Sequence, residues 1–148
     1  MRHVLFLCTG NYYRSRFAEE LFNHHASLGG LGWVASSRGL AIERGAANVG
    51  SMSVHTREEL RHRNIHPLAA ERLPEACMTA DLAHADIVIA LDEIEHRELL
   101  HAKFAEWEDR VTYWSVHDVN VSDPADAIAS IDRQITQLIK RLQRASSS

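Results

Sequence analysis

Short apolar runs alternate with longer amphipathic segments along this chain. Residues 3–7 and 86–91 are nearly continuous apolar runs, a pattern typical of strands that are covered on both faces. Residues 32–37 and 111–116 have the same character less strongly. The pattern therefore predicts four strands distributed over the length of the chain.

Between and after these strands, apolar residues recur three and four positions apart. The spacing predicts helices over 14–27, near 53–63 and after Asp92, which has the D-x-x-E spacing of a capping box with Glu95. The C-terminal helix has the strongest period, with an apolar face made of Ile128, Ile131, Ile135, Leu138 and Leu142. Strands that alternate with helices predict an α/β fold, a doubly wound four-stranded parallel sheet with helices on both faces.

Length and composition are those of one globular domain spanning residues 1–148. Sixteen basic and twenty acidic side chains give a net charge of −4, which argues against nucleic-acid binding because that requires a basic surface. No apolar run approaches the roughly 20 residues that cross a bilayer, so no membrane association is expected. The first strand begins at once, without a signal peptide, which predicts a cytoplasmic protein.

The two cysteines, Cys8 and Cys77, are too few for a disulfide framework. They form no C-x-x-C pair, and we expect no metal site. Cys8 instead stands at the carboxyl end of the first predicted strand. Open parallel sheets bind their ligands at that edge, so Cys8 is the first candidate for chemistry.

Six residues after Cys8, Arg14 begins the first predicted helix. The backbone amides between them are placed to curl into an anion-binding nest at the positive end of the helix dipole. Gly10 allows close backbone approach, Asn11 tolerates a left-handed conformation, and the planar guanidinium of Arg14 suits two phosphate oxygens. The predicted phosphate-binding residues are Thr9, Gly10, Asn11, Tyr12, Tyr13 and Arg14.

The same positive field favours the thiolate of Cys8, the nucleophilic form of cysteine. Ser15 is placed to donate its hydroxyl to that thiolate and help it leave. The alternative is that Cys8 is only a buried strand residue and Arg14 a surface charge, because cysteine is among the most buried residue types. The C-x5-R spacing, with a strand before it, a helix after it and Ser15 behind it, favours the catalytic interpretation.

These residues resemble the low-molecular-weight protein tyrosine phosphatase family, whose loop reads C-x-G-N-x-x-R-S near the N-terminus. The matching residues are Cys8, Gly10, Asn11, Arg14 and Ser15. Three later segments are also similar to the family: 33–36 resembles its second strand, 85–92 its third strand and 121–124 its V-x-D-P motif. The likeness extends over nearly the whole chain, in the same order.

The resemblance implies hydrolysis of phosphotyrosine, in a protein or a small aryl phosphate, without a metal or other cofactor. It implies a phosphocysteine intermediate on Cys8, Asp123 as general acid and Ser36 as a support for the loop. An aspartate followed by proline is also typical of a helix start, so Asp123 has a second interpretation as an N-cap. Asp118, five residues upstream, is the alternative acid.

The chain departs from the family pattern at several positions. Tyr13 stands where the family often has a second loop cysteine, and Ala69 stands where it has a supporting histidine, for which His66 is the candidate substitute. Residues 125–126 replace tyrosines that line the family's pocket. The resemblance therefore predicts the chemistry of the site more firmly than it predicts which substrate the site prefers.

The pocket walls are inferred from the same resemblance. Tyr12 is expected to border the pocket and stack on an aromatic leaving group. Tyr13 is instead expected to pack against neighbouring helices. Ile42 and Glu43 are expected to form a further wall.

Two other functions remain open on the sequence. A thiol-dependent arsenate reductase shares this fold and loop but passes a disulfide between further cysteines, and residues 91–92 are Leu-Asp where such enzymes carry one. Cys77 is expected to lie away from the loop, since the resemblance places it before the third strand. A non-catalytic phosphate-binding module would not need the nucleophile, arginine and acid that are all present. The phosphatase interpretation is therefore preferred.

Overall fold

The sheet contains four parallel strands, as the alternation of strands and helices predicts. In the computed structural model, which describes residues 1–117 and 123–147, the strands are β1 (Arg2–Cys8), β2 (Trp33–Gly39), β3 (Ile87–Ala90) and β4 (Thr112–Tyr113). Their order in the sheet is β2-β1-β3-β4, and all three pairings are parallel. The fourth strand is shorter than predicted, because the chain then bends and Ser115 bridges Asp92 in the antiparallel sense.

Helices follow each strand. The α-helices are α1 (Arg14–Leu28), α2 (Val54–His62), α3 (Thr79–His84), α4 (Glu93–Lys103) and α5 (Pro124–Ser147), and the 3-10 helices are η1 (Ile42–Gly45) and η2 (Ala105–Trp107). The sequence pattern did not predict α3, whose six residues are too few to show a helical period. No helix in the described part of the chain is long and apolar enough to cross a membrane.

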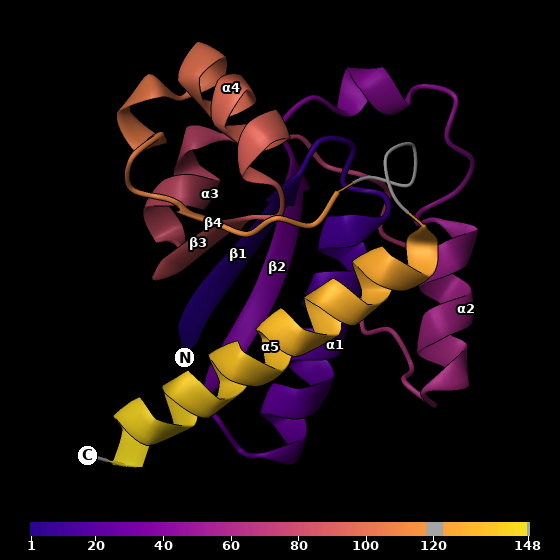
Figure 1. Cartoon of the computed structure of the whole chain (residues 1–148), viewed down its shortest axis with the longest axis vertical. Helices are drawn as coiled ribbons and strands as arrows, with labels where there is room; N and C mark the ends of the chain where they lie inside the picture. Colours follow the sequence, from indigo (N-terminus) through magenta and orange to yellow (C-terminus); the bar gives the residue numbers. More distant parts are fainter. Residues whose placement is uncertain (118–122, 148) are drawn as a thin grey trace.

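Two apolar cores lie on opposite faces of the sheet. Side chains of β1 alternate between them, with Val4 and Phe6 in one core and Leu5 and Leu7 in the other. Helices α1 and α5 lie side by side across the first face, and α3 and α4 cover the second (Figure 1). This arrangement confirms the predicted doubly wound fold.

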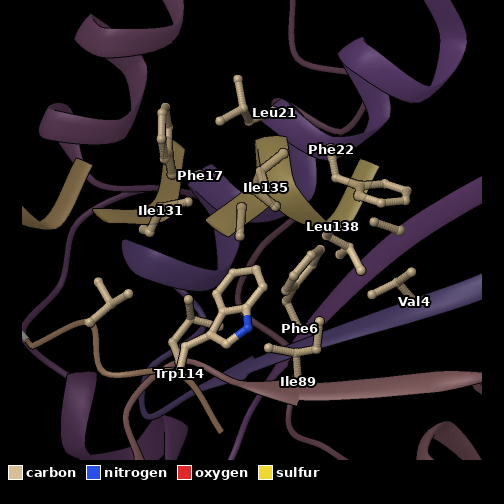
Figure 2. Close-up of a cluster of buried hydrophobic side chains, with 14 of the residues drawn as sticks. Val4, Phe6, Phe17, Leu21, Phe22, Ile89, Trp114, Ile131, Ile135 and Leu138 are labelled. Atoms are coloured by element: carbon tan, nitrogen blue, oxygen red, sulfur yellow. The ribbon is translucent and has the colours of Figure 1, made fainter. Parts of the chain in front are cut away.

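The first core buries the apolar face that the C-terminal period predicts. In Figure 2, Phe6 and Ile89 of the sheet and Trp114 face side chains of α1 and α5. The α5 residues in this core include Ile128, Ile131, Ile135, Leu138 and Leu142. Because α1 and α5 are both anchored here, the start of each helix has a defined position at the carboxyl edge of the sheet.

Candidate active site

The predicted phosphate loop connects β1 to α1. Cys8 is the last residue of β1 and is buried, and Arg14 is the first residue of α1. Asn11, midway between them, has a φ of 51°, the left-handed conformation expected for it. The loop packs closely against Gly39 of β2. A Cβ added at Gly39 would lie 2.9 Å from the carbonyl oxygen of Thr9, so a side chain at this position would push the loop away.

Asn11 holds the loop through its side chain. Its Nδ2 donates to the hydroxyls of Ser15 (3.0 Å) and Ser37 (2.9 Å). Its Oδ1 accepts from Arg72 Nη1 and from the backbone amide of Glu75, both at 3.0 Å. The fully buried amide group is thus completely hydrogen-bonded, which keeps the left-handed backbone in place.

Ser37, and not the predicted Ser36, supports the loop. Successive side chains of a strand point to opposite faces, and in β2 the buried positions alternate, with Trp33, Ala35 and Ser37 buried and Ser36 only partly so. Ser36 therefore points away from Asn11, and the sequence interpretation was wrong by one position. Ser37 also donates a hydrogen bond to Glu19 of α1.

Arg72 supports the loop beside Asn11, although the sequence predicted a histidine or its substitute in this role. Its Nη2 donates to Glu19 Oε1 and to Ser37 Oγ, both at 2.9 Å, in addition to the Asn11 contact. Ala69 is engaged only through its backbone: its carbonyl accepts from Arg16 Nη2 at 2.6 Å, and its amide donates to Glu20. His66 is exposed and does not take the histidine's place.

The Cys8 thiol lies against Ser15. Cys8 Sγ is 2.9 Å from Ser15 Oγ, and both residues are buried. Because Ser15 Oγ also accepts from Asn11, its own proton is directed away from the amide. A hydroxyl in this position is suited to stabilise a thiolate on Cys8.

Among the described residues, Arg14 is held by acceptors on α4 and on the segment after β4. Its Nη1 donates to the carbonyl of Val116 at 3.0 Å, and its Nη2 forms an ion pair with Glu95 Oε2 at 2.6 Å. The Arg14 side chain is 3% exposed and that of Glu95 is 31% exposed. The arginine is therefore fixed from the side of α4 and of the segment after β4.

The capping box that the sequence predicts for α4, between Asp92 and Glu95, does not form. Asp92 makes no side-chain cap; its carboxylate pairs with the His117 ring at 3.1 Å, and its amide donates to His96 Nδ1. Glu95 turns instead to Arg14 and to His96 Nε2, which is 2.8 Å away. The neighbouring His96 and Arg14 lower the pKa of Glu95 to about 2, so its carboxylate is ionised at neutral pH.

Above the loop lies a cavity of about 570 Å³, which we call the loop pocket. Its lining includes Cys8, Tyr12, Arg14, Arg44, Gly45, Asn48, Val54, His55 and Glu95. The wall expected from Ile42 and Glu43 is formed by the residues just after them, and Glu43 is exposed and pairs with Lys103.

The two loop tyrosines have different environments. Tyr12 borders the loop pocket, and its hydroxyl donates to the carbonyl of Val49 at 2.6 Å. Tyr13 is buried, packs edge-on against the His55 ring, and donates its hydroxyl to the carbonyl of Pro124 at 3.2 Å. Tyr13 thereby connects the phosphate loop to the start of α5.

Asp123 is exposed and immediately precedes α5. Its Oδ1 accepts from the amide of Ala125 at 2.8 Å, and its carbonyl accepts from Asp126 and Ala127. Asp123 therefore has the N-cap geometry that the Asp-Pro sequence suggested. The alternative acid, Asp118, lies outside the described residues.

Cys77 lies nearer to the loop than its place in the sequence suggested. Its amide donates to the carbonyl of Gly39 at 2.8 Å, and Gly39 pairs in register with Cys8. Only the end of β2 thus separates the two cysteine segments. Burial raises the pKa of the Cys77 thiol to about 12, which leaves it protonated and unreactive at neutral pH.

Comparison with known proteins agrees with this fold and loop. The family model for low molecular weight phosphotyrosine protein phosphatase matches residues 3–147. A protein-arginine-phosphatase of Bacillus subtilis is 27% identical over 145 residues, which cover 95% of this chain and 91% of the relative. The structure of YfkJ from Bacillus subtilis superposes with a TM-score of 0.83 at 24% identity, covering 98% of this chain and 96% of that chain.

A low molecular weight protein tyrosine phosphatase from T. tengcongensis is similar over the whole fold. Its structure has a TM-score of 0.75 at 25% identity, covering 98% of this chain and 99% of that chain. The family match extends across every element that builds the loop pocket. The chain belongs to the low molecular weight phosphotyrosine protein phosphatase family.

Proposed function

We propose that this protein hydrolyses phosphorylated protein side chains, phosphotyrosine first among them, through a phosphocysteine intermediate on Cys8. The observation that carries the proposal is the position of the Cys8 thiol, buried at the end of β1 and 2.9 Å from Ser15 Oγ, in the short loop that leads to Arg14 at the start of α1. The loop amides and Arg14 bind the phosphate, and the cysteine supplies the nucleophile.

The reaction has two balanced steps. In the first, the Cys8 thiolate forms a bond to phosphorus while the bond from phosphorus to the leaving oxygen breaks, and Asp123 gives that oxygen its proton. In the second, the Asp123 carboxylate takes a proton from water, which attacks phosphorus and releases the thiolate. The Tyr13 contact with Pro124, the residue after Asp123, supports this role because it ties the start of α5 to the loop.

The thiol-relay alternative has less support. A disulfide relay needs a second reactive thiol at the end of β3, where this chain has Leu91, which is fully buried. Cys77 is protonated at neutral pH, since its pKa is raised to about 12. Hydrolysis through Cys8 needs no second thiol, so neither Leu91 nor the unreactive Cys77 counts against it.

The test is an assay of the purified protein on an aryl phosphate, with and without vanadate. We expect turnover that vanadate inhibits, and no turnover by Cys8→Ser, since a serine hydroxyl is barely ionised at neutral pH. The variant should still bind vanadate, because the loop amides and Arg14 are unchanged. Activity of Cys8→Ser above about a tenth of wild type would rule out the thiolate mechanism, as serine cannot replace an obligatory thiolate.

Phosphoarginine is a second candidate substrate. A relative of this chain is a protein-arginine-phosphatase, and the ionised Glu95 in the pocket wall suits a positively charged leaving group. The two substrates are separated by kcat/KM on peptides that differ only in the phosphorylated residue. A preference for the phosphotyrosine peptide supports the first proposal, and a preference for the phosphoarginine peptide replaces it with the second.

A further inference from the structure

A second cavity, of about 510 Å³, adjoins the loop pocket along α2. We call it the α2 groove. The two cavities share one lining residue, Val54, which is 58% exposed. The lining of the α2 groove is Val54, Arg57, Glu58, Arg61, Asn64, Ile65, His66, Pro67 and Ala70. A chain whose phosphorylated residue enters the loop pocket can therefore continue into this groove.

Helix geometry places the groove's charges in one stripe. Val54, Arg57, Glu58 and Arg61 follow the i, i+3, i+4, i+7 spacing of a single helix face. Arg57 is fixed in the wall, because its Nη2 donates to Ser51 Oγ at 2.6 Å. The Arg61 guanidinium is exposed and has no hydrogen-bond or ion-pair partner among residues 1–117 and 123–147.

The stripe is basic although the chain as a whole is acidic. The chain has a net charge of −4. Two arginines line the groove against one carboxylate, that of Glu58, and Arg44 stands at the adjoining wall of the loop pocket. The local charge is therefore opposite to that of the molecule.

We propose that the α2 groove binds acidic residues that flank the phosphorylated residue of a protein substrate; this rests on the proposed function. Arg57 and Arg61 are one helical turn apart, a rise of about 6 Å. Two residues of an extended chain cover about that distance, so carboxylates at alternate positions of the substrate meet both arginines. The exposed Val54, which lines both cavities, offers the peptide an apolar contact where they meet.

The experiment uses two phosphotyrosine peptides that differ only in their flanking residues, glutamate in one and glutamine in the other. At low ionic strength, wild-type kcat/KM should favour the glutamate peptide about three- to tenfold, the size expected of a few exposed charge pairs. High salt should remove the preference because it screens these pairs. Arg61→Gln should reduce the preference, and Arg61→Glu should abolish or reverse it.

The matched control is Arg141→Gln, which removes another exposed arginine, late in α5, the helix whose C-terminal end lies away from α2 (Figure 1). The control and both Arg61 variants should hydrolyse an aryl phosphate as wild type does. Equal kcat/KM for the two peptides in wild type, or the same loss in Arg141→Gln as in Arg61→Gln, would overturn the proposal.

Binding distinguishes failure of this proposal from failure of the proposed function. If the protein does not hydrolyse the aryl phosphate, the proposed function is wrong. Fluorescence anisotropy of the two peptides on the Cys8→Ser variant then still measures docking. Tighter binding of the glutamate peptide, weakened by Arg61→Glu, supports the groove, and equal binding contradicts it.

Discussion

The side-chain amide of Asn11 makes four hydrogen bonds at a position where the backbone is left-handed. Two of its partners, Arg72 and Glu75, come from a segment more than 60 residues away in sequence. The loop conformation is thus stabilised by tertiary contacts rather than by local propensity. Arg72 is central because the same guanidinium also contacts Glu19 and Ser37.

Arg72→Met should loosen the phosphate loop. Without the guanidinium, Asn11 Oδ1 and Glu19 Oε1 each lose one hydrogen-bond donor. The free energy of unfolding should therefore fall by about 1–3 kcal/mol. We also expect vanadate affinity to fall, because the loop amides no longer share one orientation. Urea denaturation and vanadate inhibition of the variant measure these effects, with Arg133→Met on the exposed face of α5 as the control. Unchanged vanadate affinity would show that Arg72 does not position the loop.

Glu95 couples the phosphate loop to α4 through Arg14. Its pKa is lowered to about 2 in the folded state, against about 4.3 in an unfolded chain. Between these values the unfolded state binds more protons, so this contribution to stability is complete above about pH 5 and is lost as the pH falls toward 2.

Below about pH 5, the free energy of unfolding of Glu95→Gln should therefore fall less steeply with falling pH than that of wild type. The difference between the two proteins should be constant from pH 7 to about pH 5 and should shrink below that, because the glutamine has no proton to gain. Urea denaturation at pH 7, 4 and 3 provides the measurement. The exposed Glu106→Gln is the control and should follow wild type throughout. Parallel curves for wild type and Glu95→Gln would contradict the ion pair's role.

At the scale of elements, the start of α5 combines a helix cap with the proposed acid. The Asp123 carboxylate accepts from the amide of Ala125, and Tyr13 reaches the carbonyl of the next residue. A single residue thus supports both the helix and the proposed chemistry. Two substitutions separate these roles, because asparagine caps a helix as well as aspartate does but cannot supply the proton.

Asp123→Asn should slow phosphotyrosine hydrolysis by about 10²–10⁴-fold, the usual contribution of a general acid. An ester with an acidic leaving group should slow much less, since it departs without a proton. Thermal unfolding should hardly change for Asp123→Asn, whereas Asp123→Ala should lose about 1 kcal/mol with the cap. Steady-state kinetics on both esters and thermal denaturation check this. If both esters slow equally, Asp123 is a cap alone.

At the scale of the whole molecule, the sheet sets the separation of the two cysteines. Cys8 ends β1, Gly39 of β2 pairs with it, and Ala76 bridges Gly39 on the far side. Two strand spacings amount to about 9.5 Å, which exceeds the roughly 7 Å between Cα atoms that a disulfide allows. The cysteines are close in the fold but not within bonding reach.

Peroxide should therefore inactivate the protein by oxidising Cys8 without forming a Cys8–Cys77 disulfide. Cys77 stays a thiol because it is buried and its pKa is raised to about 12. With Tyr13 in place of a second loop cysteine, continued exposure should drive Cys8 to irreversible acids. Mass spectrometry of peroxide-treated protein decides the outcome, and Cys77→Ser should be inactivated at the same rate. An intramolecular disulfide in most molecules would revive the thiol-relay mechanism.

Features of the fold that depend on residues close together in the chain could be predicted from the sequence. The period of α5, the strand before Cys8 and the turn at Asn11 depend on residues within a few positions of one another. These signals predicted the parallel sheet, the loop at its carboxyl edge and the N-cap at Asp123. The family resemblance of the loop predicted its chemistry, phosphate ester hydrolysis through Cys8.

Other features were decided by tertiary structure. Choosing Ser37 over Ser36 requires knowing which face of β2 meets α1, and placing Arg72 at Asn11 requires a contact 61 residues apart. Glu95 left its local capping box because the charge of Arg14, on another helix, competes for the same carboxylate. The sequence by itself determined the elements and the reactive loop, whereas the partners that hold the loop depend on which surfaces pack together, since burial makes distant polar groups pair with one another.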